Sequence, residues 1–404
     1  MKTRSMYKAE RLSVDRISTL PQPILESILS LLPTEEAART SILSREWRYK
    51  WTTIPNLRFE LLNTTSELTS DIACTKKEMD MNDLHQLLLL RQGPIHEFTL
   101  DMQGYCEHYD CFEFDQLILN LSRNHTVKKL TLTGLYDIDY IGYKLPVSVF
   151  SLHHLTDLYL CMFDLHHPPT FDGFGSLGSL YLHEVKISTK HLLHLLSNCP
   201  SLKCFSLWLV LDPVPQELPT SLIHLKYLRL EGMCIDEDCR LAFHVLIKCS
   251  PNLERFELLV YGREYILLLR QGPIYELTLQ LSVDEDIWES SDKCTINELL
   301  KCLPAIEHLT TSPRISEWVV LDSVPQELPT SLIHLRYLCF KDMTLVERCG
   351  LAFLLVFIKC SPNLEKVKLE VNNIIIFHML FVLIITCQNT LTQTLPGIFG
   401  KLDI

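Results

Sequence analysis

A short apolar pattern recurs along most of the chain and limits its fold more than any other feature. The pattern is L-x-x-L-x-L, with Ile, Val or Phe in place of some leucines. Clear copies begin at Ile95, Val127, Leu155, Leu177, Leu202, Leu225, Leu253, Ile274, Leu335 and Leu364, and a weaker one begins at Ile306. The final L-x-L alternates as a β-strand does, with apolar residues on one face. One such strand cannot bury its own apolar face, so the copies are expected to stack on one another.

The residues before several copies have helical periodicity and stop at a proline. His191–Leu196 is one such stretch, and Cys-Pro or Cys-Ser-Pro follows the helical stretches at Cys199, Cys249 and Cys360. Successive copies begin 21 to 32 residues apart, which brackets the period of leucine-rich repeats. The pattern therefore predicts an α/β solenoid over residues 84–263, with parallel strands and with helices or irregular segments on its convex side.

A longer stretch of sequence occurs twice. Residues 212–225 return at 322–335, and residues 89–95 return at 268–274. The unequal offsets indicate that residues 264–371 are a shortened second pass through the array. A recent duplication and a fused gene model both fit this near-identity.

The N-terminal segment reads as short, closely packed helices. Apolar residues follow Pro21 at helical spacing, and Pro33 ends that helix. Thr34 is expected to cap a second helix, and Trp47 and Trp51 share one face of a third. A unit of this size cannot bury all of that apolar surface alone. The surplus packs either on the rest of the chain or on another protein.

Three runs of residues make this segment, residues 15–59, resemble a plant F-box. They extend from Asp15 to Thr34, from Arg39 to Trp51 and from Thr53 to Phe59. The resemblance implies a three-helix module that docks on the Skp-type adaptor of a cullin-RING ubiquitin ligase. By matching positions, the implied docking residues are Leu20, Pro21, Ile24, Leu25, Ile28, Leu32, Pro33, Ser44 and Trp47. Leu29 and Leu43 fit the core of the module equally well, and Trp51 fits either role.

The whole arrangement resembles plant F-box/LRR proteins that often end in an FBD domain. Asn252-Leu253-Glu254 and Asn363-Leu364-Glu365 are similar to the run into that domain, but after Val371 the chain departs from the pattern, as if the domain were truncated or replaced. The resemblance implies a non-catalytic, substrate-recognition subunit of an SCF-type ubiquitin ligase. A target protein would meet the outward strand residues, for example Lys129, Thr131, Tyr159, Tyr181, Ser206, Arg229 and Glu257. The alternative is an interaction scaffold, or a degenerate family copy, without a ligase role.

The remaining segments are a flexible N-terminus (1–14), a linker (60–83) and an apolar tail (372–404). Ile374 to Cys387 is almost continuously apolar. It is shorter than the ~20 residues that a spanning helix needs, so a buried strand or helix is favoured over a membrane anchor. No apolar signal segment follows Met1, and scattered cysteines then indicate reduced thiols. We expect a protein of the nucleus or cytoplasm.

The search for chemistry in the sequence favours binding over catalysis. The net charge of -12 argues against nucleic acid as a partner. Gly173 to Gly178 matches G-x-G-x-x-G, but a repeat strand follows it where a dinucleotide site needs a helix, so a loop is predicted. Cys106, His108 and Cys111 lack the paired spacing of zinc ligands. The sequence therefore predicts no catalytic residue, metal or cofactor.

Overall fold

The computed structural model describes most of the N-terminal half of the chain and the strands of the rest. The described residues are 17–62, 81–104, 111–124, 126–134, 143–165, 173–208, 222–232, 246–260, 274–281, 294–295, 305–312, 319–320, 332–341, 354, 357–358, 360–370 and 402–403. The expected N-terminus 1–14, most of the expected linker and almost all of the expected tail lie outside these residues. The duplicated stretches fall only partly within them. Two compact units divide the chain, Met1–Leu177 and Gly178–Ile404.

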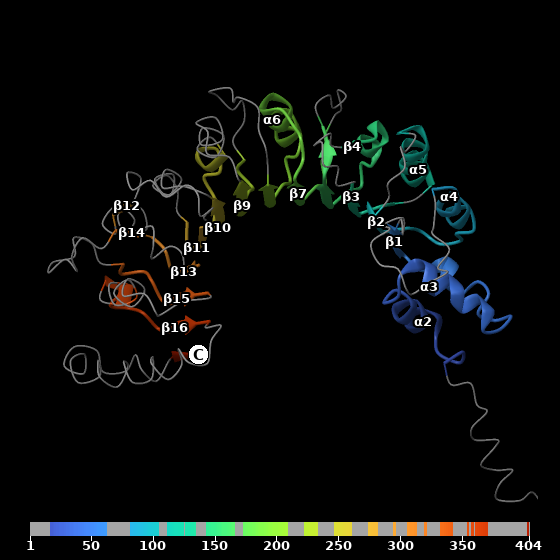
Figure 1. Ribbon diagram of the computed structural model, residues 1–404, viewed down its shortest axis with the longest axis horizontal. Helices are drawn as coiled ribbons and strands as arrows, with labels where there is room; N and C mark the ends of the chain where they lie inside the picture. Colours follow the sequence, from blue (N-terminus) through green and yellow to red (C-terminus); the bar gives the residue numbers. More distant parts are fainter. Residues whose placement is uncertain are drawn as a thin grey trace, which may run out of the picture. The chain divides into compact units, whose positions relative to one another are not determined.

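The first unit begins with the helical module (Figure 1). Its elements are α2 (Gln22–Leu29), α3 (Thr34–Arg39) and the 3-10 helices η1 (Thr40–Ile42) and η2 (Lys50–Thr53). They surround one small core, which consists of Leu25, Leu29, Ala37, Trp47, Trp51 and Ile54. Leu20, Ala38 and Leu87 pack against this core and remain partly exposed.

Two details of the module differ from the sequence-based expectation. The segment with Trp47 and Trp51 is a turn followed by η2, held by bonds that span three residues, such as Lys50 N to Trp47 O at 3.2 Å. Both indoles still reach the core, because packing decides the local conformation. Thr34 is the first residue of α3 and does not cap it. Its hydroxyl instead accepts the backbone N–H of Arg58, at 2.8 Å.

A parallel sheet follows directly on the module within the first unit. Its strands, in spatial order, are β1 (Asn56–Leu62), β2 (Glu97–Gly104), β3 (Lys129–Thr133) and β5 (Asp157–Cys161). The short β4 (Tyr143–Lys144) pairs with β6 (Phe163–Asp164). The connections carry α4 (Met81–Leu89), α5 (Cys111–Asn124) and η3 (Val147–Ser151). Because β1 lies partly within the residues expected to end the F-box, the module continues straight into the first strand of the array.

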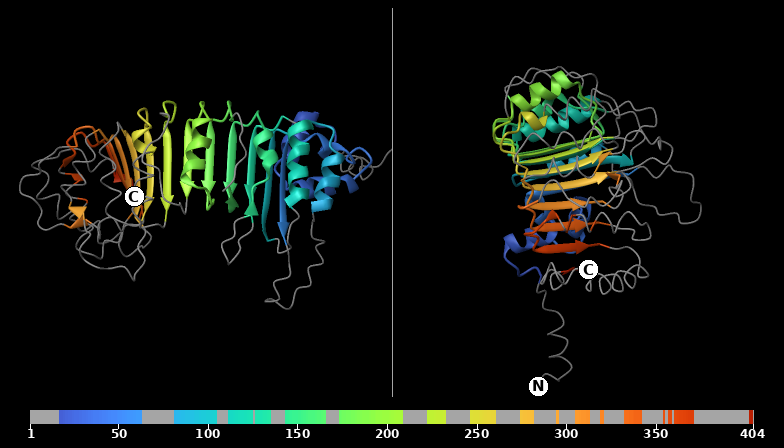
Figure 2. Two further views of the ribbon diagram at one scale, coloured as in Figure 1. Left: turned by 90° about the horizontal axis from the view of Figure 1, so that it is seen from above. Right: turned by 90° about the vertical axis from the view of Figure 1, so that its left-hand side faces the viewer.

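The second unit repeats the same architecture with more strands. They are β7 (Ser179–His183), β8 (Cys204–Trp208), β9 (Tyr227–Gly232), β10 (Arg255–Val260), β11 (Glu276–Leu281), β13 (His308–Thr311), β15 (Tyr337–Phe340), β16 (Lys366–Leu369) and β17 (Leu402–Asp403), each parallel to the next. A separate pair joins β12 (Cys294–Thr295) to β14 (Val319–Val320). Helix α6 (Thr189–Ser197) lies on one side of the strands, and the strands point in one direction (Figure 2). The predicted solenoid is therefore confirmed.

Register places the leucines of the repeat in continuous buried rows. In the second unit, one row consists of Leu180, Phe205, Leu228, Phe256, Leu277, Leu309, Leu338 and Val367. Each of these side chains is almost fully buried. In the weak copy that begins at Ile306, Thr311 takes the place of the last leucine. Its hydroxyl is buried and has no hydrogen-bond partner.

The duplicated stretches make the same contacts in both copies. The Asn252 side-chain amide donates to Ile223 O at 2.7 Å, and Asn363 donates to Ile333 O at 2.7 Å. Each asparagine follows a Cys-Ser-Pro stop and reaches back to the turn of the preceding repeat. The second pass therefore folds by the same rules as the first where the structure describes both.

The buried Thr311 hydroxyl predicts a stabilising substitution. Thr311→Val keeps the shape of the side chain and removes the unpaired polar group, so stability should rise by about 1 kcal/mol. The half-exposed neighbour Thr310 is the control, because Thr310→Val should give no comparable gain. Urea unfolding of the three proteins measures the difference. A fall in stability for Thr311→Val would show that the hydroxyl has a partner.

Candidate functional site

The helical module exposes several large apolar side chains. They include Ile17, Ile24, Ile28, Leu31, Leu32, Ile42 and Leu43, each at least 41% exposed. Helix α2 explains how this exposure arises. Leu25 and Leu29 form one stripe of the helix and point into the core, while Ile24 and Ile28 form the adjacent stripe and remain outside. We call this set the apolar face.

The structure divides the predicted docking residues into surface and core. Pro21, Ile24, Ile28, Leu32, Pro33 and Ser44 are exposed, and Leu20 is half-buried against the core. Leu25 and Trp47 are buried in the core of the module, where they are 0% and 7% exposed. Leu29 and Trp51 are also core residues, whereas Leu43 is exposed. Leu31 and Ile42, which the prediction did not include, are 84% and 87% exposed.

A polar network behind the apolar face fixes α2 against η2. The Thr53 hydroxyl donates to the Glu26 carboxylate at 2.6 Å and accepts from the Gln22 amide at 3.1 Å. Lys50 donates to the amide oxygen of Gln22 at 3.1 Å. These bonds leave α2 little freedom to rotate, so Ile24 stays on the outside of the module.

The predicted target-binding residues lie on the outward side of the strands. In the second unit, Tyr181, Ser206, Arg229 and Glu257 are successive neighbours in one row across β7 to β10. All four are half-buried, between the leucine rows and solvent.

The same holds for the predicted residues of the first unit. Thr131 on β3 lies opposite Tyr159 on β5, and both are half-buried. Lys129 is exposed and pairs with Glu97 on the neighbouring strand at 2.9 Å. This hydrogen bond raises the pKa of Lys129. The period-two prediction of outward positions is therefore correct in both units.

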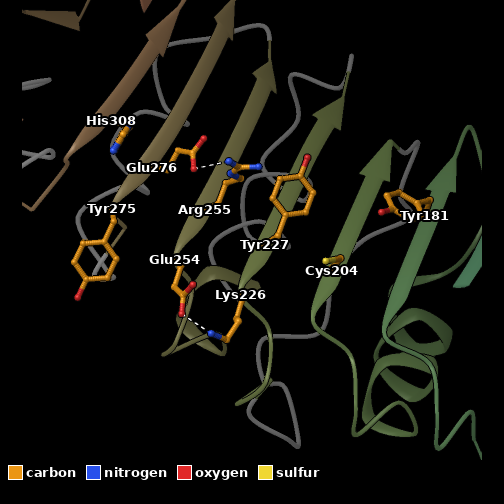
Figure 3. Close-up of a pocket in the computed structure, with 9 residues that line it drawn as sticks. All are labelled: Tyr181, Cys204, Lys226, Tyr227, Glu254, Arg255, Tyr275, Glu276 and His308. Carbon is orange, nitrogen blue, oxygen red and sulfur yellow. Dashed lines mark hydrogen bonds and ion pairs between the residues drawn. The ribbon is translucent and has the colours of Figure 1, made fainter. Parts of the chain in front are cut away.

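A shallow cavity of about 690 Å³ opens on the outward side of the strands in the second unit (Figure 3). It is lined by Tyr181, Cys204, Lys226, Tyr227, Glu254, Arg255, Tyr275, Glu276 and His308. Most of these residues precede the predicted row by two or three positions along their strands. The prediction named only Tyr181 among them. The alternation of the strand that gave Arg229 also gives Tyr227, one outward position earlier, so the same signal could have found it.

Charges in this cavity balance one another across neighbouring strands. Lys226 contacts Glu254 at 2.7 Å, and Arg255 contacts Glu276 at 2.6 Å. Burial, together with the carboxylate of Glu257, raises the pKa of Tyr227, so its hydroxyl stays protonated at neutral pH. The surface thus presents phenol hydroxyls and paired charges. This arrangement suits hydrogen bonding to a protein surface more than attraction of a strongly charged ligand.

Of the cysteines at the helix–strand corner, Cys199 and Cys360 are buried and Cys249 is half-buried. Burial raises the pKa of the Cys249 thiol, and it raises the pKa of Cys360 to about 11. Among the described residues, no three His, Cys, Asp or Glu side chains lie close enough to hold a metal ion. Cys106 and His108, considered as zinc ligands, lie outside those residues.

Two further sequence features can be compared with the structure. Gly173 to Gly178 contains no helix and leads into β7, as predicted for a loop, and Gly173 has a φ of 97°. No helix in the described part of the chain is long and apolar enough to cross a membrane. The apolar stretch 374–387 lies outside that part.

The buried Cys360 thiol should resist alkylation in the folded protein. Its pKa of about 11 leaves little thiolate at pH 8, whereas an unfolded cysteine titrates near about 8.5. Because the folded pKa is the higher one, this group favours the folded state below about pH 8.5 and loses that effect as the pH rises towards 11. Mass spectrometry after iodoacetamide treatment at pH 8, with and without urea, measures the reactivity. Equal rates in the two conditions would contradict the burial.

Comparison with known proteins places both surfaces in matched domains. A family model of the F-box domain matches residues 17–59, and a model described as "At1g61320/AtMIF1, LRR domain" matches residues 92–397. The chain is 30% identical over 359 residues to F-box/FBD/LRR-repeat protein At1g13570 of Arabidopsis thaliana, covering 89% of this chain and 76% of the relative. It is 25% identical to FBD-associated F-box protein At1g60410 of the same species, covering 91% and 86%.

A solved structure, that of the Leptospira interrogans LRR protein LIC12759, aligns with 89% of this chain and 92% of its own, at a TM-score of 0.31 and 15% identity.

Proposed function

Because this chain belongs to the family of plant F-box/LRR-repeat proteins, we propose that it is the substrate-recognition subunit of an SCF-type ubiquitin ligase. Members of this family are in general non-catalytic adaptors. The proposal assigns one partner to each surface: a Skp-type adaptor to the apolar face, and a target protein to the outward side of the strands.

The apolar face carries the first half of the proposal. Ile24, Ile28 and Leu32 stand partly exposed on a module that matches the F-box domain. Fully burying one such side chain is worth about 1.5–3 kcal/mol, so a partner that covers several of them gains substantial affinity. A soluble module keeps this much aliphatic surface outside at a cost, which a bound adaptor removes.

The proposed docking set follows the structure more closely than the sequence motif. It consists of Pro21, Ile24, Ile28, Leu31, Leu32, Pro33, Ile42, Leu43 and Ser44, all exposed. Leu25 and Trp47 support this set from the core. Leu20 packs against the core, so only its exposed part could contribute to the docking set.

The outward side of the strands, which we call the strand face, is the proposed site for the target. Its cavity in the second unit combines tyrosines with paired charges. Tyrosine and arginine are enriched at protein–protein interfaces, because each offers apolar area and directional hydrogen bonds. Arg255 and Tyr275 are therefore the residues from which we expect a target to gain the most.

The proposed mechanism is positional. Holding the target beside the ubiquitin-transferring enzyme turns an encounter between free molecules into a reaction within one complex. This chain then needs no nucleophile or general base of its own. Its contribution is two affinities, one for the adaptor and one for the target.

Charged substitutions on the apolar face should abolish adaptor binding without unfolding the module. Ile24→Asp and Ile28→Asp each place a carboxylate in the proposed interface, and each should weaken binding by at least about 30-fold, the effect of losing 2 kcal/mol. Isothermal titration with a purified Skp-type adaptor measures the affinity. The chain is kept at full length for this experiment.

Leu89→Asp is the matched control, because Leu89 is also a large exposed aliphatic residue of the first unit but lies on α4, outside the module. Equal binding by all four proteins would rule out the apolar face. No binding by the wild type would leave the interaction scaffold without a ligase role as the better function.

A photo-cross-linking residue should identify the target when placed in the cavity of the strand face. At position Tyr275 we expect capture of a protein whose ubiquitination falls in cells that carry Ile24→Asp. The same residue at His194, an exposed position on α6, should not capture it. Capture at both positions, or of proteins whose ubiquitination does not depend on Ile24, would argue against the cavity as the target site.

A further inference from the structure

Arg91 connects the repeat array to the helical module. It lies between α4 and β2, outside the module, and its guanidinium is directed back at η2. Its Nη1 donates to Trp51 O at 2.7 Å, and its Nη2 donates to Ile54 O. One side chain thus holds two backbone carbonyls at the end of the last helix of the module.

Ile54 O follows the end of η2, whereas Trp51 O also accepts the backbone N–H of Ile54 at 3.2 Å, so the guanidinium is its second donor. The last carbonyls of a helix lack N–H groups from a following turn, and their dipoles attract a positive charge. The next two residues complete the arrangement, since Gln92 N and Gly93 N both donate to Thr52 O, at 3.1 and 3.4 Å. Residues 91–93 therefore cap η2 from the side of the array.

Burying the Arg91 guanidinium costs free energy unless its hydrogen bonds to Trp51 O and Ile54 O are kept. Burial lowers the pKa of Arg91 to about 10, although the nearby Glu26 carboxylate opposes that shift. Its Nε has no hydrogen-bond partner. A guanidinium gives up water in this way only where fixed acceptors replace it, and here the acceptors are the carbonyls of the module.

Gly93 allows the close approach that the cap requires. A Cβ at this position would lie 3.0 Å from Thr53 Cα and 3.1 Å from Thr53 O. Both atoms belong to the backbone and cannot swing aside. An added Cβ would therefore require the 91–93 segment and η2 to move apart by a few tenths of an ångström, so Gly93 permits the contact at its present distance.

Three further contacts join the same parts. Residues of β1 pair in parallel with β2, and the Thr34 hydroxyl accepts from Arg58 N at the start of β1. Leu87 of α4 packs against the core of the module. The module thus touches the array along η2, β1 and α4, and only the η2 contact depends on a buried charge.

We propose that Arg91 and Gly93 form a clamp that fixes the orientation of the helical module on the first repeats, which makes Arg91 a positioning residue for ubiquitin transfer. The functional part rests on the proposed ligase role. A series of contacts connects Ile24 on the apolar face to residues 91–93. Ile24 lies on α2, and Glu26 of the same helix accepts a hydrogen bond from Thr53. Residues 92 and 93 donate to the carbonyl of Thr52, next to Thr53. Without the clamp, the module would change its orientation relative to the first repeats by pivoting about β1.

Distances between two spin labels test the clamp. Genetically encoded labels at Ser27 on α2 and Ser151 on η3 occupy exposed positions of the first unit. Pulsed dipolar spectroscopy of the full chain should give a narrow distribution for the wild type. Arg91→Met and Gly93→Ala should each broaden it, while adaptor affinity stays unchanged. Arg58→Met is the matched control, because the Arg58 side chain is exposed and pairs with Glu60 on the surface, while its contact with Thr34 is made by the backbone N–H.

Each outcome decides the proposal. A narrow distribution in all four proteins, or a broad one in the wild type, overturns the clamp. If Arg91→Met fails to fold, as loss of near-ultraviolet dichroism would show, Gly93→Ala decides alone, since it leaves the guanidinium in place. Failure of the wild type to bind an adaptor removes the ligase role but leaves the distance result intact, so the two failures are distinguishable.

Discussion

Stacking of one repeat strand on the next is the interaction on which the rest of the structure depends. Leu228 on β9 lies between Phe205 on β8 and Phe256 on β10, and none of the three could be buried without its neighbours. Each such side chain contributes about 1.5–3 kcal/mol when it is buried. The inner positions of every strand are therefore constrained, and the outer positions are left to vary. Arg229 and Glu257 occupy such outer positions, and so do the residues of the cavity.

The helical module also separates inner, buried positions from outer, exposed ones, but within a single short helix. Leu25 and Ile24 are adjacent in sequence, yet one is fully buried and the other faces solvent. The polar network of Gln22, Glu26 and Thr53 keeps α2 in the orientation that separates them. The packing of Leu25 into the core therefore places Ile24 on the apolar face.

Repeat strands could be predicted from the sequence because their period is built into the spacing of the leucines. The outward row with Arg229 followed from the same alternation. The division of the docking residues could not be predicted, since the stripes of Ile24 and Leu25 both fit an apolar helix face. Only tertiary packing decides between them, and it placed Leu25 inside.

Long-range polar contacts also could not be predicted from the sequence. Thr34 has the identity of a helix cap, but Arg58 N uses its hydroxyl from 24 residues away. Arg91 donates to backbone carbonyls, and every residue has a carbonyl, so the sequence does not indicate which ones Arg91 contacts. The ion pair of Arg255 and Glu276 arises from the register of two strands. Exposed pairs of this kind contribute only about 0–1 kcal/mol, so their role is in recognition more than in stability.

Hydrogen exchange of the full chain, measured with and without a saturating Skp-type adaptor, shows whether the adaptor binds the apolar face and leaves the strands free. We expect slower exchange confined to residues 17–44 of the module, and no change on β8 to β13. Protection on the strand face, or none in the module, would contradict the assignment of the two surfaces.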